Sequence, residues 1–225
     1  MYRRGESKTL EKFWKRVKKE GSKLLAVAID MWPAYIESVM ENNMVVDIVF
    51  DRFHIVRKMN EVVDTTRRQI YIIYREETEL HKRKIIKGLR WLLLKKEENL
   101  DEEKDEKKRL KEALKINQPS TQIYYLKEEL NLLWKQNDIK EAERFLMEWV
   151  KKARATTIQS LKKFCNMLLS HRSGILKWYR NKISTEPLEG FNKIKLLKRK
   201  PYGYRDNEFF KLKIYALYDT RYALL

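Results

Sequence analysis

Two short apolar runs near the N-terminus decide the fold, and each of them ends in an aspartate. Residues 24–30 read LLAVAID, and residues 44–51 read MVVDIVFD. Short runs rich in Val and Ile, without polar alternation, predict strands that are buried on both faces. The segment between them starts at Pro33, which suits the first turn of a helix, and extends to Glu41. A strand, a helix and a second strand predict a parallel pair joined by a right-handed crossover.

The two aspartates are the first candidate site residues. Asp30 and Asp51 follow the carboxyl ends of the predicted strands, where open α/β sheets bind their ligands. Neighbouring strands lie about 5 Å apart, so the two carboxylates would suit a divalent cation that prefers oxygen ligands. Asp30 also stands just before Pro33, so helix capping is an alternative role. His54 either packs in the core and bonds Asp51, or orients the metal site as an outer partner.

The composition points to a polyanionic partner. The 225 residues carry 50 Lys and Arg against 32 Asp and Glu, a net charge of +18. This excess favours nucleic acid over a membrane, because no stretch approaches the roughly 20 uncharged apolar residues that a span requires. The N-terminus lacks the apolar core of a secretory signal. The single cysteine, Cys165, excludes an intramolecular disulfide and predicts a buried thiol in a reducing cytoplasm.

The rest of the chain divides into helical and basic parts. Residues 7–20 have the apolar spacing of a helix, and residues 58–183 show the same spacing over several amphipathic helices. Their tryptophans, and Trp32 near the first strand, favour core positions over stacking platforms. After Ser184, Pro187 suits a new helix start, which places Glu186 and Glu189 near its positive end as alternative acids. Basic residues interleaved with tyrosines follow, as a phosphate backbone and exposed bases require: Lys193, Lys195, Lys198, Arg199, Lys200, Tyr202 and Tyr204.

Three ordered groups of residues resemble the DDE transposases of bacterial insertion sequences, and among them the L-three (ISL-three) family. They are residues 30–35 (DMWPAY), 50–56 (FDRFHIV) and 189–199 (EGFNKIKLLKR), the last followed by Tyr-Gly-Tyr at 202–204. The resemblance implies an α/β core of ribonuclease-H-like type, incomplete because its first strands are missing, with a large all-α insertion and a predominantly helical chain. It divides the chain into a partial core at 1–57, a helical insertion at 58–183 and a catalytic helix with a basic tail at 184–225.

The resemblance also implies a reaction and its residues. Asp30 and Glu189 match family acids that hold Mg²⁺, two ions in a full active site, while Asp51 and His54 match a D-x-x-H signature that supports the site. The substrates would be insertion-sequence ends and target DNA, bound by the basic residues after Glu189. The chain would work in the cytoplasm, apart from membranes, as a homo-oligomer or with an upstream transposase fragment.

One family feature has no counterpart before Asp30. The first acid of the family lies on an upstream core strand, whereas this chain offers only Glu6, Glu11 and Glu20 in or near a helix. Loss of a shared carboxylate loosens both ions of a two-metal site. We therefore expect an N-terminally truncated transposase that is inactive alone. The alternatives are a non-catalytic, basic DNA-binding remnant and a helical protein-interaction module.

Overall fold

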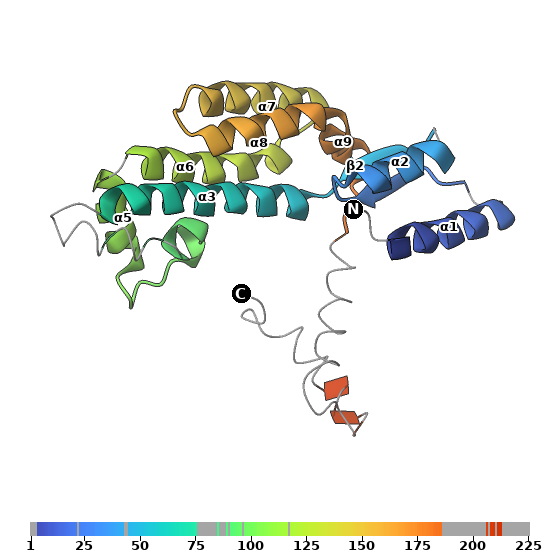
Figure 1. The fold of residues 1–225 in the computed structure, drawn as a ribbon, viewed down its shortest axis with the longest axis horizontal. Coiled ribbons are helices and arrows are strands. Elements are labelled where there is room, and N and C mark those ends of the chain that lie inside the picture. The colour runs from blue at the N-terminus through green and yellow to red at the C-terminus, as the bar shows by residue number, and fades with distance from the viewer. Residues whose placement is uncertain are drawn as a thin grey trace. The chain divides into compact units, whose positions relative to one another are not determined.

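The fold is mostly helical and contains one small sheet (Figure 1). The computed structural model describes residues 4–21, 23–42, 45–75, 85, 89, 91–95, 97–116, 118–185, 206, 208–209 and 211–212. The elements are α1 (Arg4–Lys19), β1 (Ala26–Ile29), α2 (Pro33–Asn42), β2 (Asp47–Phe50), α3 (Arg52–Arg75), η1 (Glu97–Asn99), α5 (Glu106–Ile116), α6 (Gln118–Leu130), η2 (Asn131–Lys135), α7 (Ile139–Arg154), α8 (Gln159–Ser170), α9 (Arg172–Leu176) and α10 (Trp178–Asn181).

The predicted strand–helix–strand unit is present. β1 and β2 pair in parallel with Ala26 opposite Asp47 and Ile29 opposite Phe50, and α2 connects them. The helix starts at the proline that the sequence marked, because proline has no N–H to lose in a first turn. The order of these elements, with α1 in front, therefore agrees with the sequence-based prediction.

Two apolar clusters cover the sheet. The smaller one joins Trp14 of α1 and Val39 of α2 to Val46, and the larger one contains Phe50 and the helices that follow. Ile29 and Ile48 pack against both clusters, so the sheet lies between them. All four residues of β1 are only half-buried, whereas Val49 and Phe50 of β2 are buried. The prediction of complete burial therefore holds for the end of β2 and not for β1.

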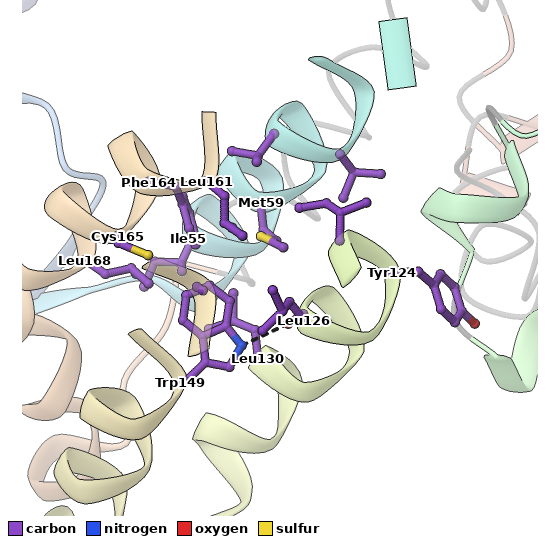
Figure 2. Close-up of a cluster of buried hydrophobic side chains, with 14 of the residues drawn as sticks. Ile55, Met59, Tyr124, Leu126, Leu130, Trp149, Leu161, Phe164, Cys165 and Leu168 are labelled. Carbon is purple, nitrogen blue, oxygen red and sulfur yellow. Dashed lines mark hydrogen bonds between the residues drawn. The ribbon is translucent and has the colours of Figure 1, made fainter. Parts of the chain in front are cut away.

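The helical part folds around α3. Both α6 and α8 pack along α3, and α7 packs on α8 (Figure 1). Ile55 and Met59 of α3 meet Leu161 of α8 and Leu130 of α6 in the close-up of the buried cluster (Figure 2). Trp149 lies in the same cluster, and its indole Nε1 donates to the carbonyl of Leu126 at 2.9 Å. The hydrogen bond satisfies the one polar atom of a side chain that is 1% exposed.

Several details differ from the sequence-based predictions. The long helix α3 begins at Arg52 rather than near residue 58, because apolar residues at helical spacing start directly after β2 with Ile55 and Met59. Trp32 and Trp91, predicted as core residues, are 48% and 58% exposed. The spacing of apolar residues identifies the face of a helix on which a tryptophan lies. It does not show whether another element packs against that face. Cys165 is fully buried as predicted, and burial raises the pKa of its thiol to about 11.

The chain forms two compact units, residues 1–183 and 184–225. The three-part division at 57 and 183 stays a prediction. Within the described residues, no helix is both long and apolar enough to cross a membrane. The cytoplasmic location likewise stays a prediction.

Candidate active site

Asp30 and Asp51 occupy equivalent positions at one edge of the sheet. Each follows the last paired residue of its strand, since Ile29 lies opposite Phe50. The ladder continues one step further, because the backbone N–H of Asp51 donates to the carbonyl of Ile29 at 3.2 Å. The carboxyl ends of parallel strands lie at the same edge of a sheet, so the backbones of Asp30 and Asp51 are neighbours there.

Asp30 also organises the turn that leads into α2. Its Oδ1 accepts the backbone N–H of Trp32 at 3.0 Å. Trp32 directly precedes Pro33, the first residue of α2. Aspartate commonly bonds its own backbone in this way ahead of a helix. This hydrogen bond belongs to the turn before α2 and does not involve an N–H of the helix, so the capping alternative stays a prediction. Oδ2 has no hydrogen-bond partner among the residues that the structure describes, so an anionic acceptor remains at this edge.

Asp51 is held more firmly than Asp30. It is 2% exposed and immediately precedes α3, whose residue Ile55 donates its N–H to the Asp51 carbonyl at 3.4 Å. The N-terminus of a helix carries partial positive charge, which stabilises a carboxylate placed there. The long helix α3 therefore compensates part of the cost of burying this acid next to the sheet.

His54 lies in the first turn of α3, one turn after Asp51. The ring is half-buried and meets the Phe53 ring edge-on, with centroids 5.3 Å apart. Phe53 itself is 48% exposed, so the imidazole is reached from solvent on this side. The spacing of three residues puts His54 and Asp51 on the same side of the helix start, which both sequence-based interpretations require.

The remaining predicted residues lie outside the described part of the chain. This holds for both alternative acids, Glu186 and Glu189. It also holds for the predicted DNA-binding residues Lys193, Lys195, Lys198, Arg199, Lys200, Tyr202 and Tyr204. Their meeting with Asp30 and Asp51, and the choice between the two glutamates, stay predictions.

The two acids at the sheet edge suit a hard divalent cation but do not complete its ligand set. Carboxylate oxygens are the donors that Mg²⁺ prefers, and it keeps several waters in addition. Within the described ranges, no group of three or more His, Cys, Asp or Glu side chains could hold a metal ion. The described residues thus place two acids at this edge, and the predicted third acid, Glu189, lies outside them.

Residues that sequence reasoning did not single out fix β2 against the helices. Gly174 of α9 lies against Phe50, where an added Cβ would come within 2.5 Å of Phe50 Cε2 and 3.1 Å of the Ile48 carbonyl oxygen. Only a residue without a side chain permits this approach. The sequence shows a glycine within a helical stretch, which signals close contact but does not name its partner.

A second link joins the start of β2 to α10. The carboxylate of Asp47 pairs with Lys177 at 3.0 Å and accepts from Asn181 Nδ2 at 3.1 Å, with Arg180 at 3.8 Å. The Asn181 hydrogen bond, followed by that of Lys177, holds the pKa of Asp47 below its usual value. This network ties α10 to the start of β2, whose other end leads to Asp51.

A cleft of about 450 Å³ lies beside the start of α3. Its charged lining is balanced, with Arg52, Lys107 and Lys135 against three glutamates, Glu97, Glu98 and Glu128. A cleft without net charge gives no attraction for a polyanion. The positive charge that DNA would meet must therefore come from another surface.

Comparison with known proteins identifies the family. A family model described as a transposase, of the ISL3 group of DDE transposases, matches residues 3–214. The transposase of insertion sequence element IS1001 from Bordetella parapertussis is 38% identical over 198 residues. This match covers 87% of the chain and 48% of the relative, so the chain spans about half the length of the curated relative. No solved structure matches the chain significantly.

The chain belongs to the ISL3 family of DDE transposases. The resemblance drawn from three groups of residues is therefore confirmed. Members of this class generally use a divalent metal, which agrees with carboxylates at the sheet edge.

Proposed function

We propose that this chain contributes to the active site of a transposase that cuts an insertion sequence from DNA and joins it to a target. One observation carries the proposal: Asp30 and Asp51 follow adjacent parallel strands at equivalent positions, in a chain of this family. The carboxylates of Asp30, Asp51 and Glu189 would hold Mg²⁺. When bound, such ions polarise the phosphodiester and activate the attacking hydroxyl.

The described residues of the site have distinct tasks in this proposal. Asp30 offers Oδ2 while Oδ1 fixes the turn before α2, so its carboxylate is pre-oriented. Asp51 is the more rigid acid because β2 and α3 both constrain its backbone. His54, one helical turn later, would orient Asp51 or a bound phosphate from the solvent side. The basic residues after Glu189 would hold backbone phosphates, contacts that give affinity and little sequence specificity.

The fold of the core is part of the proposal. We take β1 and β2 as two strands of a ribonuclease-H-like sheet, because they are parallel, lie between two apolar clusters and carry acids at one edge. The half-buried state of β1 agrees with a strand whose further neighbour lies outside the described residues.

We also propose that the chain alone does not complete the reaction. Of the acids before Asp30, Glu11 and Glu20 lie at α1, exposed and paired with Lys15 and Arg16. A helix surface paired with lysine and arginine does not present a carboxylate to a sheet edge. A further acid, contributed for example by a second copy of the chain, would then be required.

Metal binding gives the sharpest test of the site. Titration of the full chain with Mn²⁺, followed by electron paramagnetic resonance of free Mn²⁺, should show binding that Mg²⁺ competes away. We expect Asp30→Asn and Glu189→Gln each to weaken this binding roughly tenfold or more, the effect typical of disturbing a metal site. Glu186→Gln is the matched control in the same segment and should bind as the unchanged chain does. Equal binding by Glu189→Gln, or loss in the Glu186→Gln control, would overturn the assignment of ligands.

A further inference from the structure

The part of the chain around α7 and α8 has a one-sided charge pattern. From Trp149 to Thr185 the sequence contains no Asp or Glu, while Lys and Arg recur throughout. The unit 1–183 folds α7 and α8 into a packed pair, with α7 along one border of the helical part (Figure 1).

The outer face of α7 carries a row of four cations and one methionine. Its residues follow each other at helical spacings of four and three, so they share one face: Lys140, Arg144, Met147, Lys151 and Arg154. All five are exposed, Met147 to 43%. The opposite face, with Leu146 and Trp149, is buried in the core. We call the five residues the α7 stripe.

The charges of the α7 stripe are not neutralised by neighbours. Among the described residues, no carboxylate lies within ion-pair distance of Lys140, Arg144 or Lys151. Arg154 donates instead to the neutral side chain of Asn166 on α8, at 2.6 Å. Cations elsewhere on helix surfaces do find acids one turn away, as Lys15 does with Glu11 at 2.7 Å.

Two acids of α7 flank the stripe, and neither forms an ion pair with its residues. Glu143 turns toward Arg172, 3.5 Å away. The exposed Glu148 lies one turn after Arg144 and offsets part of the charge, so the four cations of the stripe still exceed the one flanking acid that has no ion pair elsewhere in the described part of the chain.

Helix stability does not account for the stripe. Lys151 and Arg154 lie in the last turn of α7, where the helix dipole favours cations. Lys140, by contrast, lies in the first turn, two residues after the capping residue Asp138, where the same dipole disfavours a cation. A row that continues against this preference points to a ligand that attracts it.

We propose that the α7 stripe binds the phosphate backbone of double-stranded DNA. This inference rests on the proposed function and names a second DNA surface, apart from the segment after Glu189. Fourteen residues of helix span about 21 Å, a length over which a duplex presents several phosphates on each strand. In this proposal the lysines and arginines of the stripe contact phosphates, and such contacts give affinity with little sequence specificity. A membrane is a poorer partner, because the apolar face of α7 is used in the core.

Neutralising the stripe tests the inference. The variant Lys140→Gln/Arg144→Gln/Lys151→Gln keeps long polar side chains at exposed positions, and unchanged thermal unfolding would show that it folds. The control Lys108→Gln/Lys111→Gln/Lys115→Gln removes the same charge from an exposed face of α5 that also contains Glu112. Both are compared with the unchanged full chain by fluorescence anisotropy on a labelled 30-base-pair duplex of arbitrary sequence.

We expect the α7 variant to bind the duplex roughly tenfold or more weakly near 0.1 M salt, with a log–log salt dependence about two to three units shallower. The α5 control should change far less. Equal loss in the control, or unchanged binding by the α7 variant while the full chain binds, would overturn the inference and leave the proposed function standing. A full chain that binds no duplex at low salt would overturn both.

Discussion

At the scale of single residues, the two acids of the sheet edge are placed by different means. Asp30 is fixed by its own turn, since one carboxylate oxygen bonds the backbone of Trp32. Asp51 is fixed by its neighbours, because the ladder and the first turn of α3 hold its backbone while its side chain is buried. An acid with one oxygen committed to a turn can still offer the other to a ligand.

The ion pair at the opposite end of β2 gives a prediction on pH dependence. The pKa of Asp47 is lowered in the folded state, so its stabilising effect is complete above its ordinary pKa near 3.8. The effect is lost as the pH falls through the lowered value. Asp47→Asn should reduce the free energy of unfolding by about 1 kcal/mol at pH 7. Urea unfolding of both proteins measures this difference.

The pH series supplies the discriminating result. The gap between Asp47→Asn and the unchanged chain should stay constant down to about pH 4. It should shrink as the pH falls further, from the ordinary pKa near 3.8 through the lowered pKa of the folded state, because Asp47 of the unchanged chain then becomes protonated. Asp105→Asn, an exposed position away from this ion pair, serves as control. A gap that stays constant as the pH falls through that lower range would show that the charge of Asp47 does not stabilise the fold.

At the scale of elements, the contact between α9 and β2 joins the helical part to the sheet. The short helix α9 reaches β2 because Gly174 lets its backbone lie against Phe50. Phe50 cannot move aside easily, since it is 6% exposed and its ring meets His171 edge-on at 5.0 Å. The position of β2, and of Asp51 at its end, therefore depends on a residue more than one hundred positions away.

Gly174→Ala tests this packing. The added methyl group would overlap Phe50, and overpacking of a core typically costs about 1–3 kcal/mol, more than the roughly 1 kcal/mol that Ala gains over Gly in a helix. We expect a lower midpoint in urea unfolding. Ser173→Ala, the exposed neighbour on α9, should have little effect.

The same substitution in a Phe50→Leu chain shows whether overlap with the Phe50 ring causes the loss of stability. In a Phe50→Leu chain the ring is absent, so adding Gly174→Ala should cost less than it does in the unchanged chain. Equal costs in the two backgrounds would exclude the clash with Phe50 as the reason.

At the scale of the whole molecule, DNA binding and metal-dependent chemistry lead to different expectations. The net charge of +18 supports DNA binding by the chain itself. Chemistry, by contrast, needs every carboxylate of the site in place, and two-metal catalysis clamps both the attacking and the leaving oxygen. Binding and cleavage should therefore separate in this protein.

A nicking assay tests this separation. We expect the purified chain with Mg²⁺ to nick a supercoiled plasmid that carries its gene and flanking DNA no faster than Asp30→Ala does. Both proteins should retard the same DNA equally in a gel at low salt. Nicking that requires Mg²⁺ and disappears in Asp30→Ala would show that the chain holds a complete active site.

The sequence by itself determined the local order of the fold and the family. The apolar runs, Pro33 and the acids at the strand ends are local signals, and they correctly placed β1, α2, β2 and the adjacent positions of Asp30 and Asp51. The tertiary structure alone decided that α9 packs on Phe50, that Asn181 bonds Asp47 across 134 positions, and that Trp32 stays exposed. Periodicity and capping report each segment's own preferences, whereas these contacts depend on which surfaces meet after the segments have formed.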